Sequence, residues 1–222
     1  MLKDYELFNQ IRNVLKLKIG EKIILGDGKM NEGIAEIKEY GKDFIRVEAG
    51  EIKINQNEPA GQVILYCAIL KKENFELVIQ KATEIGVKEI VPLITARTVK
   101  LDIKKDRLEK IIKEASEQSG RGIMPILHDP LEFNKTFDYA KHSKVNLFFD
   151  SSGGDFTEDF KLKTENYLIG VWIGPEGGWD SQELELARKS GFKIINLGKL
   201  TLRAETAAIV ATYRVVHNSD CH

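Results

Sequence analysis

The 222-residue chain is 42% hydrophobic and 30% charged, which is the composition of an ordinary globular protein with one or two domains. Its 33 Lys and Arg residues are balanced by 34 Asp and Glu residues, so no global positive charge indicates a nucleic-acid partner. The longest apolar runs, 63–70 and 167–174, are too short to cross a bilayer, and the N-terminal segment lacks the apolar core of a secretory signal. Its 2 cysteines form neither a disulfide framework nor a zinc-ligand spacing. We therefore expect a cytoplasmic protein with no membrane or metal partner.

Residues 1–58 have the pattern of a small β-barrel domain. Short runs typical of strands alternate with turn signals that contain glycine, and a brief helix precedes them. Pro59 and Gly61 then break regular structure, so 56–61 is expected to be a linker. The expected strands are 21–25, 33–40 and 44–50.

Strands and helices alternate in the second expected domain, residues 62–222. Its strands are almost continuously apolar, which is typical of a parallel sheet covered by helices on both faces. Asp180 and Glu183 form the capping box of one helix, and Gly86, Gly120 and Gly191 are helix stop signals. The expected strands are 63–70, 87–94, 144–150, 166–174 and 192–198, and the expected helices are 74–85, 104–118, 180–190 and 203–216.

Three glycine-containing segments follow strands of this sheet, namely DSSGG (150–154), GPEGG (174–178) and GKLTLR (198–203). Open parallel sheets bind ligands beyond the carboxyl ends of their strands, so these segments are the candidate site. Neither the GxxxxGK(S/T) nor the GxGxxG motif is present. The acid in GPEGG would oppose a phosphate, whereas it would suit a cation such as a sulfonium.

Two charged residues of these loops each admit two interpretations. Glu176 either faces a cationic ligand or pairs with backbone donors of its own turn. Arg203 stands at a helix start, where a positive charge is unfavourable, so it either has a functional task or forms a surface ion pair. Glu205 in the first helical turn is explained by the helix dipole alone. The histidines show no metal-ligand spacing, and no Ser/His/Asp arrangement falls on a nucleophile elbow.

Four blocks of the sequence resemble the ribosomal RNA small subunit methyltransferase E family, in matching order. GEKIILGDG (20–28) is similar to the N-terminal segment of that family, so the resemblance covers most of the chain. The four blocks are KKENFELVIQKATEIGVKEIVPLITART (71–98), EASEQSGR (114–121), IGPEGGWDSQE (173–183) and LGKLTLRAETAA (197–208).

The resemblance implies a PUA-like β-barrel followed by a SPOUT-type α/β domain with a C-terminal trefoil knot, acting as a homodimer. It also implies S-adenosylmethionine as cofactor and methylation of N3 of a uridine in 16S ribosomal RNA, on the assembled small ribosomal subunit. The positions that match the cofactor loops are Ile173, Gly174, Pro175, Glu176, Gly177, Gly178, Leu197, Gly198, Leu200, Leu202, Arg203, Thr206 and Ala207.

Under this interpretation, Arg203 is the candidate catalytic residue that stabilises negative charge on the uracil carbonyl oxygens when N3 loses its proton. Glu176 is the candidate that takes this proton or steadies the sulfonium. The side chains expected to contact RNA phosphates are Arg12, Lys16, Lys71, Lys72, Arg97 and Arg121.

The chain departs from the family pattern near its N-terminus. It begins MLKDYELF, without a strand resembling RFF, and the expected VLR reads VLK, with Lys16 in the place of arginine. Lysine keeps the charge but loses the bidentate geometry of a guanidinium. Two alternatives therefore stay open: a SPOUT methyltransferase that acts on another RNA, and a noncatalytic RNA-binding or ribosome assembly factor.

Overall fold

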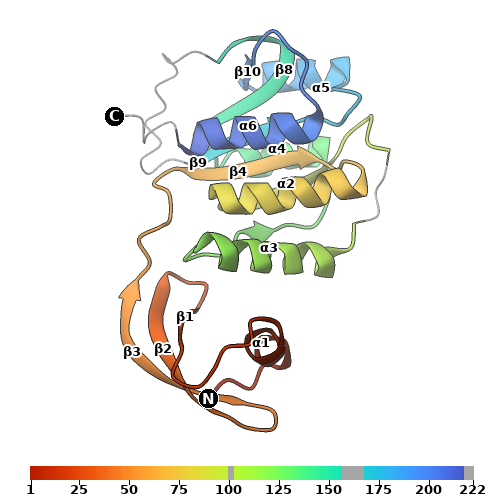
Figure 1. Cartoon of the computed structure of the whole chain (residues 1–222). Coiled ribbons are helices and arrows are strands. Elements are labelled where there is room, and N and C mark those ends of the chain that lie inside the picture. The colour runs from red at the N-terminus through yellow and green to blue at the C-terminus, as the bar shows by residue number, and fades with distance from the viewer. Residues whose placement is uncertain (100–102, 157–167, 218–222) are drawn as a thin grey trace. The chain divides into compact units, whose positions relative to one another are not determined.

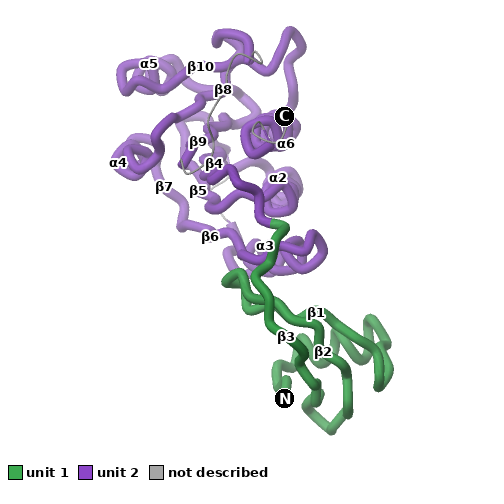
Figure 2. Tube along the Cα trace, turned by 90° about the vertical axis from the view of Figure 1, so that its left-hand side faces the viewer, with its two compact units in different colours: residues 1–57 green, residues 58–222 purple. Residues whose placement is uncertain are grey.

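The computed structural model describes residues 1–99, 103–156 and 168–217. The chain divides into two compact units, residues 1–57 and 58–222, which Figure 2 shows in different colours. The division falls inside the segment 56–61 that the sequence indicates as a linker. Each unit contains its own cluster of buried apolar side chains.

The described part of the first unit contains an antiparallel sheet in the order β1-β2-β3. An isolated antiparallel bridge joins Leu2 to Ile45 beside it. The small core of the unit centres on the buried side chains of Ile11, Ile37 and Ile45. β2 and β3 are both longer than the sequence pattern indicates. The elements are α1 (Tyr5–Asn9), the π-helical segment η1 (Gln10–Val14), β1 (Lys22–Gly26), β2 (Asn31–Tyr40) and β3 (Ile45–Ile54).

The second unit contains a parallel sheet in the order β10-β8-β9-β4-β5-β6, with β7 also paired to β5. The predicted α/β class with a parallel sheet is therefore confirmed. The described strands are β4 (Gln62–Ala68), β5 (Glu89–Ile94), β6 (Ile126–Leu127), β7 (Leu131–Glu132), β8 (Val145–Asp155), β9 (Leu168–Ile173) and β10 (Lys193–Asn196). The described helices are α2 (Lys72–Ile85), α3 (Lys105–Ser119), the 3-10 turn η2 (Phe133–Lys135), α4 (Thr136–Ala140), α5 (Ser181–Lys189) and α6 (Ala204–Val216).

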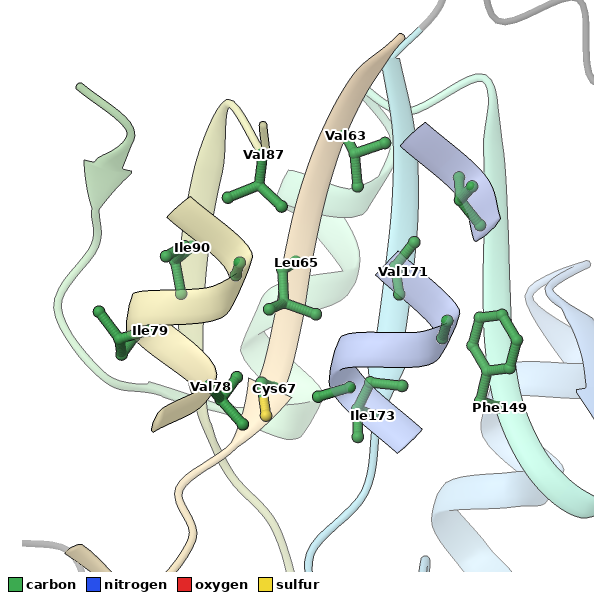
Figure 3. Packing of buried hydrophobic residues seen from close by; sticks show 14 of the residues in the cluster. Val63, Leu65, Cys67, Val78, Ile79, Val87, Ile90, Phe149, Val171 and Ile173 are labelled. Carbon is green, nitrogen blue, oxygen red and sulfur yellow. The ribbon is translucent and has the colours of Figure 1, made fainter. Parts of the chain in front are cut away.

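Helices cover both faces of this sheet: α2, α3 and α6 lie on one face, and α4 and α5 on the other (Figure 1). The central strand β4 shows why its sequence is apolar throughout. Val63, Leu65 and Cys67 point to the side of α2 and α6 (Figure 3), whereas Ile64 and Tyr66 join the cluster on the opposite face. Alternate side chains of a strand point to opposite faces, so a strand covered on both sides must be apolar at every position.

The helix boundaries follow the expected signals. Gly86 and Gly120 adopt left-handed φ values of 110° and 69° and end α2 and α3. Asp180 and Glu183 form the predicted capping box of α5. The short elements β6, β7 and α4 have too few residues to show a period, and the sequence pattern did not indicate them.

One candidate loop is instead part of a strand. DSSGG (150–154) forms the end of β8, which continues to Asp155. The pairing of β10 jumps along β8 at this point, from Phe148 opposite Ile194 to Gly154 opposite Ile195. The segment between these pairs bulges away, so it lies at the edge of the candidate site described below.

In the described residues, no helix has the length and apolar character needed to cross a membrane.

Candidate active site

A cavity of about 850 Å³ lies where β9 and β10 end and α2 and α6 begin. Two of the predicted loops form most of its wall, and the bulged part of β8 contributes the rest. Of the residues expected to hold a cofactor, all except Thr206 line the cavity, and Thr206 is exposed on the outer side of α6. The lining consists of 149–151, 173–179, 195–205, Lys71, Asn74 and Ala207.

Two glycines of GPEGG, Gly174 and Gly178, are explained by the packing and turn geometry of the protein itself. The indole of Trp179 lies against Gly174, where an added Cβ would meet its ring at 3.0 Å. The indole Nε1 donates a hydrogen bond of 3.0 Å to the Phe149 carbonyl, which fixes the ring in place. Gly178 has a φ of 72° and its N–H donates to the Pro175 carbonyl over 2.8 Å, closing a turn that favours glycine.

Glu176 has a partner that neither sequence interpretation anticipates. Its Oε1 accepts a hydrogen bond of 3.0 Å from the backbone N–H of Lys71, which directly precedes α2. This bond ties the GPEGG loop to the end of β4, and Lys72 follows as the exposed first residue of α2. Burial raises the pKa of the Cys67 thiol, and the nearby negative charge of Glu176 raises it further.

Arg97 and Glu183 hold the GPEGG loop from a second side. Arg97 Nη1 donates to the Gly177 carbonyl over 2.7 Å, and its Nη2 lies 3.7 Å from Asp180 Oδ2. The buried Glu183 carboxylate accepts from the Asp180 N–H at 2.9 Å and from the Ala96 N–H at 2.8 Å. Glu183 is therefore more than a cap, because it also joins the turn after β5 to the start of α5.

Arg203 and Glu205 lie together at the start of α6. Arg203 is the N-cap residue, with extended backbone (φ −63°, ψ 153°), and its side chain is 85% exposed. Its Nη1 lies 3.9 Å from Oε1 of Glu205, whose side chain is only 10% exposed. The second carboxylate oxygen of Glu205 is buried and has no hydrogen-bond partner among the residues that the structure describes. Sequence reasoning missed Glu205 because its place in the first turn already had a sufficient local explanation.

The expected RNA ligands of the first unit have distinct local settings. Arg12 Nη1 lies 3.4 Å from the Gly41 carbonyl, and its guanidinium stands 5.5 Å from the ring centroids of both Phe8 and Tyr40. These contacts hold the guanidinium at one place. Lys16 is exposed and has a φ of 54°, unusual for a residue other than glycine.

Arg121 does not lie where a phosphate ligand was expected. Its side chain is 6% exposed and forms a two-bond pair with Glu58, at 3.2 Å from Nε and 2.8 Å from Nη2. Its Nη1 donates to the carbonyls of Thr83 and Val87 at 3.1 and 2.7 Å. The guanidinium therefore donates to Glu58 and to carbonyls at and just after the end of α2. We assign Arg121 a structural role in place of an RNA contact.

In the part of the chain that the structure describes, no group of three or more His, Cys, Asp or Glu side chains is arranged to hold a metal ion. The polar groups at the cavity are carboxylates, amides, hydroxyls and cations, spread around its wall.

Comparison with known families defines the class of this protein. Residues 2–49 match the RNA methyltransferase PUA domain, and residues 56–216 match the RNA methyltransferase domain. The fold, with its glycine-containing loops at one sheet end, is therefore that of an RNA methyltransferase with an N-terminal PUA domain.

Three of the similar proteins share the name Ribosomal RNA small subunit methyltransferase E. The Ribosomal RNA small subunit methyltransferase E of Rickettsia conorii is 34% identical over 210 residues, covering 92% of this chain and 84% of the relative. The protein of that name from Mesomycoplasma hyopneumoniae is 39% identical over 159 residues, 69% of this chain and 68% of the relative. The crystal structure of the Neisseria gonorrhoeae enzyme of that name, bound to S-adenosyl methionine, gives a TM-score of 0.84 at 28% identity, covering 95% of this chain and 88% of that chain. The chain belongs to the ribosomal RNA small subunit methyltransferase E family, as its four sequence blocks predict.

Proposed function

We propose that the protein methylates N3 of a uridine in 16S ribosomal RNA of the assembled small subunit, with S-adenosylmethionine as cofactor. The observation that carries the proposal is the convergence of 173–179 and 195–205 on one cavity. These two segments overlap the two family blocks that match cofactor loops, 173–183 and 197–208. The relative from Neisseria gonorrhoeae, which shares the fold, binds the same cofactor.

The residues of the cavity fit this cofactor. Its volume of about 850 Å³ lies in the range of small-molecule sites, roughly 300–1,000 Å³. Ile173, Leu197 and Leu202 provide apolar wall, while Glu176 provides negative charge for a cationic ligand. When bound, S-adenosylmethionine would supply a methyl group already activated by its positive sulfur.

Two side chains would act on the uridine. N3 of uridine carries a weakly acidic proton, and losing it places negative charge on the neighbouring carbonyl oxygens. The Arg203 guanidinium at the cavity wall would stabilise that charge, which is worth most in a site shielded from water. Glu176 would accept the proton or steady the sulfonium, while its Oε1 keeps the loop tied to Lys71.

RNA would be held by cations of both units. Lys71, Lys72 and Arg97 stand at or beside the GPEGG loop, and Arg12 and Lys16 belong to the PUA unit. The net charge of −1 supports modest affinity for naked RNA and dependence on an assembled particle. We also propose that the protein is a homodimer, as the family resemblance implies. The trefoil knot implied by the resemblance is part of this proposal.

The decisive experiment is methyl transfer from labelled S-adenosylmethionine to unmodified small subunits, followed by mass spectrometry of the digested nucleosides. The expected product is 3-methyluridine. A different methylated nucleoside would refute the N3 assignment, and transfer to another RNA alone would refute the substrate. Failure to bind the cofactor at all would leave the noncatalytic RNA-binding factor as the function.

The residue roles are tested in the same assay. Arg203→Ala is expected to bind the cofactor normally and to lose about 10²–10³ in turnover, the usual effect of removing one donor that stabilises transition-state charge. Glu176→Gln keeps an acceptor for Lys71 but removes the charge, so its turnover is also expected to fall. Full turnover in either variant would remove that residue from the mechanism.

A further inference from the structure

Glu205 is a buried carboxylate whose hydrogen bonding is incomplete. It lies in the first turn of α6 and lines the cavity, and its side chain is 10% exposed. Its Oε2 is buried and has no partner in the described ranges 1–99, 103–156 and 168–217. Buried charged groups are normally paired and hydrogen-bonded, because an unpaired charge away from water is costly. The helix dipole at this position offsets a part of that cost but provides no donor for Oε2.

Arg203 is the cation placed to complete the hydrogen bonding of the Glu205 carboxylate. Among the ion pairs of the described residues, Glu205 takes part in one, with Arg203 Nη1 at 3.9 Å from Oε1. That separation is longer than a hydrogen bond, so the two side chains form an ion pair without a hydrogen bond between them. Residues two apart on a helix do not face each other, but Arg203 precedes the helix in extended conformation and its side chain can turn back over the first turn.

The chemistry of the two groups matches. A guanidinium presents two parallel N–H donors to the two oxygens of a carboxylate, and such bidentate pairs fix geometry as well as charge. Oε1 is the oxygen already near the guanidinium, and Oε2 is the oxygen that the second bond would use. The terminal torsion of a glutamate has a broad, roughly two-fold distribution. Turning the carboxylate to meet the two donors of the guanidinium therefore costs little free energy.

We propose that Glu205 is the positioning residue for Arg203: its buried carboxylate receives the guanidinium in a two-bond pair and holds it at the wall of the cavity. The proposal rests on the catalytic role proposed above for Arg203. The other charged groups that line the cavity are Lys71, Asp150, Glu176 and Lys199. Lys71 and Lys199 are the competing cations, but a lysine ammonium cannot form the bidentate pair.

The test is a double-mutant cycle on the full-length protein with Glu205→Gln, Arg203→Ala and the double variant. Single-turnover methylation of unmodified small subunits measures the rate, and calorimetric titration measures cofactor affinity. Glu205→Gln keeps the volume of the side chain, and melting temperatures verify that each variant is folded. Glu185→Gln, which removes an exposed carboxylate from α5, is the matched control and is expected to leave the rate unchanged.

Glu205→Gln is expected to lower the rate about tenfold or more, because a charge-assisted pair is lost, while cofactor affinity stays within about twofold. The double variant is expected to be as slow as Arg203→Ala alone, since residues that act as one unit are not additive. If the rate loss of the double variant equals the product of the losses of the two single variants, the proposal is overturned, because Glu205 would then act independently of Arg203. Loss of cofactor affinity in Glu205→Gln alone would overturn it as well, by making Glu205 a ligand contact.

A readout without turnover separates this proposal from the proposed function. Nitrogen NMR of the Arg203 guanidinium, with S-adenosylhomocysteine bound, should show hindered rotation in the parent protein and free rotation in Glu205→Gln. Equal rotation in both proteins would overturn the pairing, whatever the activities are. If the pairing is observed but Arg203→Ala retains full turnover, the positioning role falls together with the catalytic role of Arg203, and the structural pair remains.

Discussion

The backbone N–H of Lys71 donates a hydrogen bond to Glu176 Oε1 over 3.0 Å, although the two residues are 105 positions apart. Lys71 directly precedes α2, and Glu176 is the acid of the GPEGG loop. The bond means that the shape of this loop depends on the junction between β4 and α2. A residue that looks like an isolated loop acid in the sequence therefore also joins the segments that follow β4 and β9, two neighbouring strands of the parallel sheet.

Removing that tie should loosen the cofactor site. Glu176→Ala loses the acceptor for the Lys71 N–H, a contribution of about 1 kcal/mol, so we expect cofactor affinity to fall about fivefold. Glu176→Gln keeps a side-chain carbonyl at the same place and should bind the cofactor within about twofold of the parent protein. Calorimetric titration with S-adenosylhomocysteine measures both. Normal binding by Glu176→Ala would show that the loop holds its shape without the bond.

Two adjacent glycines of β8 should differ sharply in their tolerance of a methyl group. A Cβ at Gly153 would lie 2.6 Å from the backbone nitrogen of Ile195 and 2.7 Å from the carbonyl carbon of Ile194, so β10 would have to move. At Gly154, no atom of the described part of the chain lies within 4 Å of such a Cβ. We expect Gly153→Ala to lower the free energy of unfolding by about 1–3 kcal/mol, as overpacking does.

Gly154→Ala is the matched control, with an expected change within about 0.5 kcal/mol. Urea unfolding of the two variants measures the difference. Because β10 leads directly into the cavity loop 197–203, Gly153→Ala should also weaken cofactor binding. Equal stabilities of the two variants would contradict the close approach of β10 to β8 at this position.

Arg121 should affect stability and leave RNA binding unchanged. Its guanidinium pairs with the partly buried Glu58 carboxylate, which also accepts from the N–H groups of Gly122 and Ile123. Arg121→Ala would leave Glu58 without its cationic partner, and breaking a fully buried pair typically costs about 3–5 kcal/mol, so we expect a loss of up to about 3 kcal/mol. Thermal or urea unfolding measures this loss. A stable variant whose RNA binding shows a reduced salt dependence would instead make Arg121 a phosphate ligand.

The partly buried phenol of Tyr139 should make the protein less stable at alkaline pH. Burial, together with a hydrogen bond donated to Glu89, raises the pKa of Tyr139 from its ordinary 10.0 to about 12. Between these values the folded protein keeps the proton and the unfolded chain has lost it. Stability therefore falls as pH rises from 10 toward 12, because the folded state binds more protons.

Tyr139→Phe removes this contribution. The difference in free energy of unfolding between the parent and Tyr139→Phe should be constant below pH 9 and should shrink above pH 10, as urea titrations at each pH can measure. Tyr213→Phe, which removes an exposed phenol from the same unit, controls for loss of a hydroxyl. A difference that stays constant through pH 11 would show that Tyr139 titrates normally.

Local patterns in the sequence predicted much of the second unit. The doubly buried strand β4 has apolar side chains at alternate and at intervening positions, so its covering on both faces could be inferred. Gly86 ends α2 and Asp180 starts α5 because caps act on backbone groups within one turn. The sequence pattern of DSSGG indicates a loop, because nothing local reveals that β10 pairs with this segment as the end of β8.

The sequence by itself determined the class of the fold, the family and the segments that would form the site, because these depend on periodicity, caps and motif blocks of adjacent residues. The tertiary structure decided which side chains meet. It paired Arg121 with Glu58, tied Glu176 to Lys71 and left Glu205 buried with one oxygen unpartnered. Burial and partners are set by segments that are distant in sequence, and a local pattern carries no information about which of those segments will be near.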